Sequence, residues 1–314
     1  MLRYAAIRIA TTVPLLVALS VIAFFGIRLL PGDPIGAMLG IAGNPELVDK
    51  LRHRYGFDLP LLQQYVIWLA AALRGDFGVS VSSQQEIGPL IAQRFPATIE
   101  LMLASFLIAV GIAIPGGIVA GMNEGGRIDR TLSLLSFIGL GIPSFFLGML
   151  FIVVFSLWLR VVPAGGYQAF AADPVENLRL LLMPAAVMGI ASAPYLLRLT
   201  RSEVISIRRE PFVAYAFARG LRARTIQVRY ILRAALPALM SVLGLYIGLL
   251  LAGSITIEIL FTWPGMARLF VGAVAQRDYA IVQALILLYG CLFVVINLAA
   301  ELAQAALDPR VRLR

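Results

Sequence analysis

Six long apolar runs constrain the fold of this chain more than any other feature of its sequence. A helix rises 1.5 Å per residue, so about twenty apolar residues are required to cross a bilayer core about 30 Å thick. Of the 314 residues, 60% are hydrophobic and 14% are charged, far outside the range of soluble globular proteins. We therefore predict an all-α integral membrane protein with six transmembrane helices. The runs occupy residues 7–30, 98–122, 132–159, 180–197, 235–260 and 281–302.

Prolines and glycines mark irregular positions within these runs. The third run is long enough to tilt, and we expect a kink at Pro143. The fourth run is the shortest and contains Pro184 and Pro194. Gly117 and Gly121 have a four-residue spacing, and we expect such small residues to let neighbouring helices pack closely.

The basic residues predict the orientation of the chain. Because cytoplasmic loops of membrane proteins carry an excess of Lys and Arg, the dense arginine cluster between the fourth and fifth runs should be cytoplasmic. Threading the chain from there places both termini on the same side, together with sixteen of the 26 basic residues. The net charge of +9 thus reflects membrane topology, and we expect no nucleic-acid partner. The sixteen are Arg3, Arg8, Arg127, Arg130, nine arginines from Arg198 to Arg233, Arg310, Arg312 and Arg314.

The longest loop, residues 31–96, then faces outward. Asn44 and Pro45 predict the start of one short helix that ends near Tyr55, and a second helix is expected from Pro60 to Leu73. Their amphipathic pattern predicts a small helical cap on the outer membrane surface.

The sequence lacks the motifs of common enzymes. It contains no phosphate-binding P-loop, so any ATP used by the system should be bound by another subunit. Cys291 is the single cysteine, and the single histidine, His53, lies among charged residues. We therefore expect no catalytic residue, no metal site and no cofactor bound by this chain.

Three polar residues in or near the apolar runs are candidates for a translocation pathway: Glu100, Glu258 and Asn297. Ionisable groups are costly in hydrocarbon and tend to face a cavity or a partner. Glu100 and Glu258 lie close to span ends, so interfacial solvation is an equally good explanation for both.

One short segment of the arginine-rich loop has no polar face. Pro211 suits a first helical turn and Gly220 suits a helix stop, which predicts a helix about 13 Å long. Phe212, Tyr215, Ala216 and Arg219 should share one side of this helix, with small and apolar residues around most of the rest. We expect one side to pack on the chain itself and the other to contact a partner protein.

The segment after Gly220 should transmit any movement of this short helix. Thr225 is expected to cap a following helix that continues through Pro237 into the fifth transmembrane run.

Beyond these patterns, the chain resembles the inner-membrane permeases of ATP-binding-cassette importers, in their dipeptide and oligopeptide branch. The segment "AYAFARGLRARTIQVRYILRAALP" is similar to the cytoplasmic coupling motif of that family. It departs from the general E-A-A form, because Ala214 replaces the acid and Tyr215 replaces an alanine. Further segments resemble the branch in the same order along the chain, among them "LLPGDP", "FPATIELMLAS", "GIPSFFLG" and "ILFTWPGMARL". The coupling residues implied are Pro211, Phe212, Ala214, Tyr215, Ala216, Ala218, Arg219, Gly220, Leu221, Leu236 and Pro237.

The resemblance implies a type I importer permease fold in the bacterial inner membrane. Residues 1–96 would form the first transmembrane helix and an external loop that are additions of this branch. Residues 97–307 would form the common five-helix core, with a coupling loop at 198–235, and residues 308–314 a cytoplasmic tail.

The resemblance also implies partners. These are a second, homologous permease subunit, two cytoplasmic ATPases that bind ATP and Mg, an external solute-binding protein, and membrane lipid. The family transports dipeptides, oligopeptides, glutathione, nickel complexes and other small solutes, and the sequence does not distinguish among them.

Two other functions fit a polytopic membrane protein. A self-sufficient secondary transporter or channel should carry buried charged pairs and broken helices near mid-span. A membrane scaffold or receptor would not require a cytoplasmic helix that is apolar on both sides.

Overall fold

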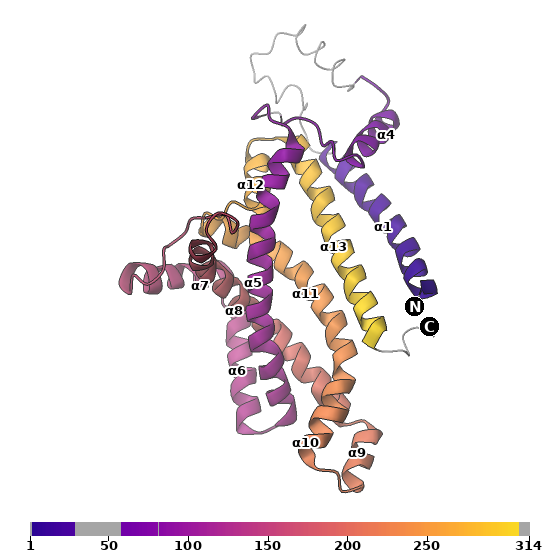
Figure 1. Cartoon of the computed structure of the whole chain (residues 1–314), viewed down its shortest axis with the longest axis vertical. Helices are drawn as coiled ribbons and strands as arrows, with labels where there is room; N and C mark the ends of the chain where they lie inside the picture. The colour runs from indigo at the N-terminus through magenta and orange to yellow at the C-terminus, as the bar shows by residue number, and fades with distance from the viewer. Residues whose placement is uncertain (1, 29–57, 81, 308–314) are drawn as a thin grey trace. The chain divides into compact units, whose positions relative to one another are not determined.

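The structure of the chain is a computed structural model that describes residues 2–28, 58–80 and 82–307. These residues are almost entirely helical, and within them the one β interaction is an isolated bridge between Val79 and Glu86. Figure 1 shows the course of the chain. The helices are α1 (Leu2–Arg28), α4 (Leu61–Ala72), α5 (Ile87–Met122), α6 (Arg127–Gly141), α7 (Ser144–Phe151), the π-helix η1 (Ile152–Trp158), α8 (Pro174–Arg208), α9 (Pro211–Ala218), α10 (Ala223–Thr225), the π-helix η2 (Ile226–Leu232), α11 (Arg233–Leu260), α12 (Met266–Ala275) and α13 (Tyr279–Leu307).

The helices confirm the predicted membrane architecture. Within the described residues, five helical segments are long and apolar enough to cross a membrane, and the number is six if a bent helix pair is counted as one span. Most are longer than the apolar runs that predicted them. The fourth span, expected over residues 180–197, is an uninterrupted 35-residue helix that contains both of its prolines. As a result, Arg198–Arg208 of the predicted coupling loop belongs to helix α8.

The third span is not one helix across the membrane. Ile142 is extended between α6 and α7, and the two parts of the span differ in direction by 96°. Pro143 explains the break, because proline lacks an N–H donor and disfavours helical geometry at the residue before it. At 15 residues, α6 alone is about 22 Å long, shorter than a bilayer core. A kink was predicted at Pro143, and the structure has a bend of 96° there that divides the run into two separate helices.

By its internal packing the chain divides into two compact units, described separately below. Unit 1 comprises residues 2–8, Ala97–Pro264 and 295–307, and unit 2 comprises residues 9–28, 58–80, 82–96 and Gly265–Val294.

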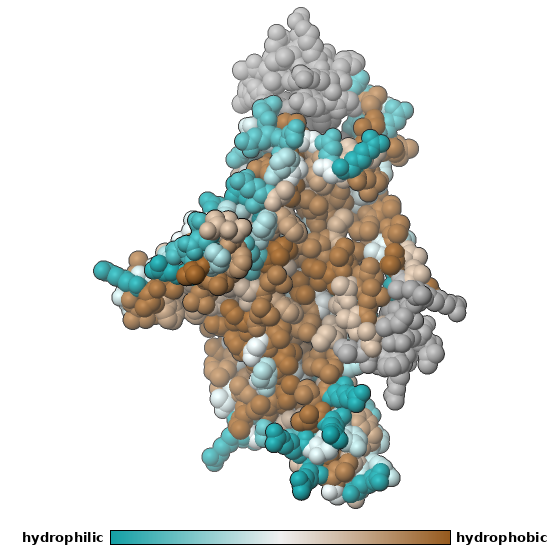
Figure 2. Space-filling model, in the orientation of Figure 1, coloured by the Kyte–Doolittle hydropathy of each residue, from teal (hydrophilic) through white to brown (hydrophobic). Residues whose placement is uncertain are grey.

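The core of unit 1 forms where α5, α7, α8 and α11 pack together around the buried side chains of Leu196, Tyr246 and Trp263. Gly117 and Gly121 face α8: a Cβ on Gly117 would lie 2.5 Å from Thr200 Cβ. This confirms that these small residues allow close helix packing. Figure 2 shows mainly apolar side chains over these helices and hydrophilic ones gathered at the α9 end of the unit.

In unit 2, α4 packs against the end of α1. Phe24 contacts the rings of Tyr65 and Trp68, and the Ser20 and Tyr65 hydroxyls are 2.7 Å apart. The prediction of a helix over residues 60–73 is thereby confirmed. The helix predicted over residues 44–55 lies outside the described residues.

A buried carboxylate joins the loop before α5 to the start of α13, also within unit 2. Asp278 Oδ2 accepts hydrogen bonds from the Ser80 hydroxyl at 2.6 Å and from the Ser82 amide and hydroxyl at 3.0 and 2.9 Å. Asp278 Oδ1 accepts a bond from the Ile281 amide at 3.4 Å, the geometry of a helix N-cap. Burial raises the pKa of Asp278, but these hydrogen bonds outweigh it and hold the pKa below its usual value.

Candidate functional site

Helix α9 has the boundaries that its sequence predicts. Pro211 occupies the first helical position after Glu210, and Arg219 is the C-cap. Gly220 follows with φ +73°, a left-handed conformation that glycine adopts without steric cost. Its amide bonds to Phe217 O at 2.9 Å and the Leu221 amide to Ala216 O at 3.4 Å, which is the pattern of a Schellman motif.

One face of α9 packs on the rest of unit 1. Val213 and Ala216 are 1% and 2% exposed and belong to an apolar cluster near the ends of α8 and α11. The expectation that Ala216 lies on the same side as Tyr215 is therefore wrong, because the helix turns Ala216 inward with Val213. The other buried members of the cluster are Val204, Ile207, Ile226, Ile231, Ala235 and Leu239.

Three aromatic side chains of α9 are exposed around the rest of the helix. Phe212, Tyr215 and Phe217 are 42%, 65% and 54% exposed. Arg219 lies over the Tyr215 ring, 5.8 Å from its centroid, which is cation–π geometry. Pro211, Ala214, Ala218, Gly220 and Leu221 are also exposed. The structure thus shows the predicted division of α9 into residues that pack on the chain itself and residues that stay exposed.

Helix α9 leads directly into the membrane-spanning part of unit 1. After Gly220, one helical segment runs from Ala223 to Leu260 through α10, η2 and α11. The prediction that Thr225 caps this segment is wrong, because Thr225 is itself helical and Arg222 precedes the first turn without a side-chain cap. Leu236 and Pro237 lie half-buried inside α11, as the predicted continuity requires.

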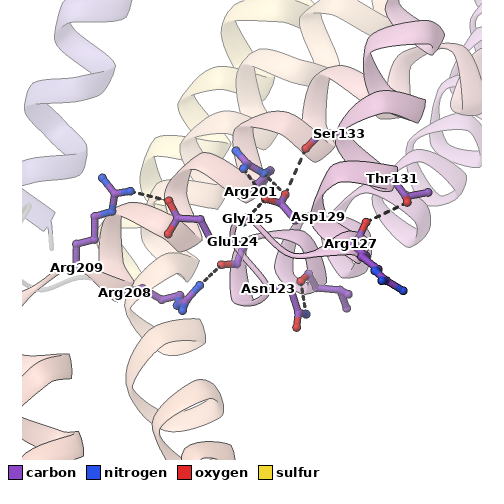
Figure 3. A network of polar contacts seen from close by, with 12 residues as sticks. Asn123, Glu124, Gly125, Arg127, Asp129, Thr131, Ser133, Arg201, Arg208 and Arg209 are labelled. Carbon is purple, nitrogen blue, oxygen red and sulfur yellow. Dashed lines mark hydrogen bonds and ion pairs between the residues drawn. The ribbon is translucent and has the colours of Figure 1, made fainter.

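A buried ion pair joins α6 to the C-terminal half of α8, close to α9 in the chain (Figure 3). Arg201 bonds to both carboxylate oxygens of Asp129, with 2.8 Å between its NH2 atom and Oδ2. Asp129 is 3% exposed and also accepts bonds from the Gly125 amide and the Ser133 hydroxyl. This network fixes the turn between α5 and α6 against α8.

The last residues of α8 extend the network. Arg208 donates to Gly121 O at 2.6 Å, and Arg209 pairs with Glu124 at 2.6 Å. The sequence pattern predicted this turn only as a source of basic charge, and the roles of Asp129 and Glu124 as acidic partners were not predicted. The signal was present in "NEGGRID", where two carboxylates flank a glycine pair at a helix start, the position that favours acidic groups.

The three pathway candidates lie on three different helices, Glu100 on α5, Glu258 on α11 and Asn297 on α13. Glu258 is 0% exposed and accepts a bond from the Thr98 hydroxyl at 2.9 Å, so it is not solvated at an interface in this structure. Glu100 accepts a bond from Asn177 at 3.0 Å, and Asn297 is half-buried in α13. Their role in a pathway stays a prediction.

Comparisons with known proteins cover the whole chain. A family model described as "Binding-protein-dependent transport system inner membrane component" matches residues 113–313, and the model of its N-terminal part matches residues 1–102. A Brucella abortus protein named as a peptide transport system permease is 34% identical over 305 residues, 97% of each chain. The glutathione transport system permease protein of Escherichia coli K12 is 33% identical over 315 residues, 99% of each chain.

A solved structure shares the fold. A chain of the MetNI methionine ABC transporter, in an inward-facing conformation, superimposes with a TM-score of 0.58 at 18% identity, covering 70% of this chain and 96% of that one. The fold is therefore that of a type I importer permease.

Proposed function

The chain belongs to the family of inner-membrane components of binding-protein-dependent transport systems, and we propose that α9 is the element through which partner ATPases drive it. One observation carries this proposal: α9 buries Val213 and Ala216 in its own unit while three of its aromatic side chains stay exposed. Such side chains, each burying about 150–250 Å² when covered, are the usual anchors of a protein interface.

The ATPases would be separate subunits that bind ATP and Mg. This chain would then supply no catalytic residue, and the energy of hydrolysis would reach it through α9 and the continuous helix that follows. The ion-pair network at the end of α8 supports this role, because it holds the base of α9 to the turn between α5 and α6.

In the complete importer, this chain would form half of a pathway with a second, homologous permease, and an external solute-binding protein would deliver the solute. The names of its relatives support a peptide or a peptide-like solute such as glutathione. The arginine distribution supports cytoplasmic N- and C-termini in the inner membrane. Glu100, Glu258 and Asn297 remain the candidate pathway residues.

The test is ATPase activity of the complete importer in reconstituted vesicles. Tyr215→Ala and Phe217→Ala should each lower hydrolysis stimulated by the binding protein about tenfold or more, since loss of an interface anchor costs about 2 kcal/mol. Gly220→Trp, which strains the end of α9, should have the same effect. Leu135→Ala removes a side chain of similar exposure from α6 and serves as the control. Unchanged stimulation in the α9 variants would mean that another surface contacts the ATPases.

A further inference from the structure

A basic hollow lies between α6 and α8, apart from the exposed aromatic side chains of α9. It has a volume of about 460 Å³ and is lined by Ser133, Phe137, Arg198, Arg201 and Ser202. Among the described residues that line it, none is a carboxylate. The hollow is thus lined by two guanidinium groups and two hydroxyl groups, of which the Ser133 hydroxyl already donates to Asp129.

The two arginines are not equivalent. Arg201 is already paired with the buried Asp129. Arg198 is exposed, and no described residue forms an ion pair or a hydrogen bond with its side chain. Guanidinium groups match the oxygen geometry of phosphate and carboxylate, so the hollow has an anion-binding group whose charge is not neutralised.

The position of the hollow along α6 points to the membrane surface. Ser133 lies six residues, or about 9 Å, along the axis from Arg127 at the start of α6, and Phe137 lies about 15 Å from it. Leu134, Phe137 and Ile138 are 59%, 71% and 50% exposed, as expected of side chains that face acyl chains. A polar hollow therefore borders an apolar helix surface, which is the arrangement that a phospholipid requires.

We propose that this hollow binds the phosphodiester headgroup of an anionic phospholipid from the leaflet at the N-terminal end of α6. Arg198 pairs with the phosphate, the Ser202 hydroxyl lies within the same hollow to donate a hydrogen bond, and the acyl chains follow the exposed face of α6 past Phe137. Basic pockets between transmembrane helices are known to hold anionic headgroups. A choline headgroup would bring its positive charge to the guanidinium groups, so the site should prefer phosphatidylglycerol or cardiolipin to phosphatidylcholine.

Native mass spectrometry of the assembled importer tests the proposal. The complex, purified in detergent doped with either phosphatidylglycerol or phosphatidylcholine of identical acyl chains, is compared for the wild type, Arg198→Gln and Arg222→Gln. Arg222 is an exposed arginine outside the hollow and controls for general surface charge. We expect Arg198→Gln to lower the ratio of phosphatidylglycerol-bound to lipid-free complex at least fivefold, with Arg222→Gln unchanged and Arg198→Lys intermediate.

Three outcomes would overturn the proposal. Equal retention by the wild type and Arg198→Gln would mean that the hollow holds no lipid in the assembled complex. An equal loss in Arg198→Gln and Arg222→Gln would mean that the attraction is one of general surface charge. Displacement of the lipid by millimolar inorganic phosphate in the wild type would identify a free phosphate as the ligand.

Discussion

Val213 and Tyr215 lie two residues apart on α9, and their environments are opposite. Val213 is 1% exposed within an apolar cluster, whereas Tyr215 is 65% exposed. A substitution at the first position therefore acts on the stability of this chain, and one at the second would act on the contact proposed for α9. The same helix can serve both purposes because eight residues provide two complete turns.

Truncation of buried and of exposed side chains in α9 separates these purposes. We expect Val213→Ala to lower the free energy of unfolding by about 2 kcal/mol, since it removes buried methyl groups and leaves a cavity. Phe217→Ala should leave stability within about 0.5 kcal/mol of the wild type, because its ring is exposed. Thermal unfolding of the purified permease measures both. A large loss of stability in Phe217→Ala would show that the ring is covered by the chain itself.

The carboxylate of Asp278 accepts hydrogen bonds from Ser80 and Ser82 in the loop before α5. Asp278→Asn should lose hydrogen bonds to a charged group worth about 1.5–3 kcal/mol and expose the amides of residues 78–87 to hydrogen exchange. The matched control is Asp76→Asn, which alters an exposed carboxylate in the same loop that accepts a bond from the Gly78 amide. Faster exchange in the control variant alone would contradict this assignment.

The wild type should show the same effect under acid. The pKa of Asp278 is lower in the folded chain than in an unfolded chain. Its contribution to stability is therefore complete above the unfolded carboxyl pKa of about 4 and is lost as pH falls through the folded pKa. Exchange of the loop amides should be constant from pH 7 to pH 5, after correction for the intrinsic rate, and should rise below about pH 4.

At the scale of elements, the buried pair of Arg201 and Asp129 connects α6 to α8. Arg201→Gln leaves the Asp129 carboxylate buried without its partner, and we expect a loss of about 3 kcal/mol in stability. Arg209→Gln breaks a pair whose arginine is largely exposed, so it should cost less than about 1 kcal/mol. Comparing the melting temperatures of the two variants tests this order. Equal shifts would mean that the Asp129 site is hydrated.

The elements were largely predictable from the sequence where a single pattern decided them. The apolar runs predicted the spans, and Pro211 with Gly220 predicted α9 to within a residue. Helix ends were less predictable, because the length of an apolar run does not indicate how far the helix continues beyond that run. Thus α8 extends eleven residues beyond the predicted end of its span, to Arg208.

Contacts between distant residues could not be predicted from those patterns. Nothing local to Asp278 indicates its bonds to Ser80 and Ser82, and nothing local to Glu258 indicates its burial beside Thr98. Periodicity assigns a residue to a face of one helix, whereas tertiary packing decides which other element meets that face. The bend at Pro143 is intermediate, since proline marks its place and packing sets its angle.

At the scale of the whole molecule, the proposed function depends on the orientation of the chain. Single cysteines placed in a Cys291→Ser background at Ala171 and Arg222, both exposed, report the two sides. In intact cells, a maleimide that cannot cross the membrane should label the cysteine at 171 and should label the one at 222 only after permeabilisation. The reverse pattern would place α9 outside the cell and exclude its contact with cytoplasmic ATPases.

The π-helix η2 has a mechanical consequence for the segment that links α9 to the membrane. In the π-helix η2 each backbone hydrogen bond joins residues five apart, whereas in the α-helix that follows it each bond joins residues four apart. If η2 changed to α-helical hydrogen bonding, the helix residues before it would shift by about one position relative to those after it. Such a shift is a rotation of roughly 100° about the helix axis. Under the proposed function, a push on α9 would therefore reach the fifth span as a rotation, with the helix between them kept intact.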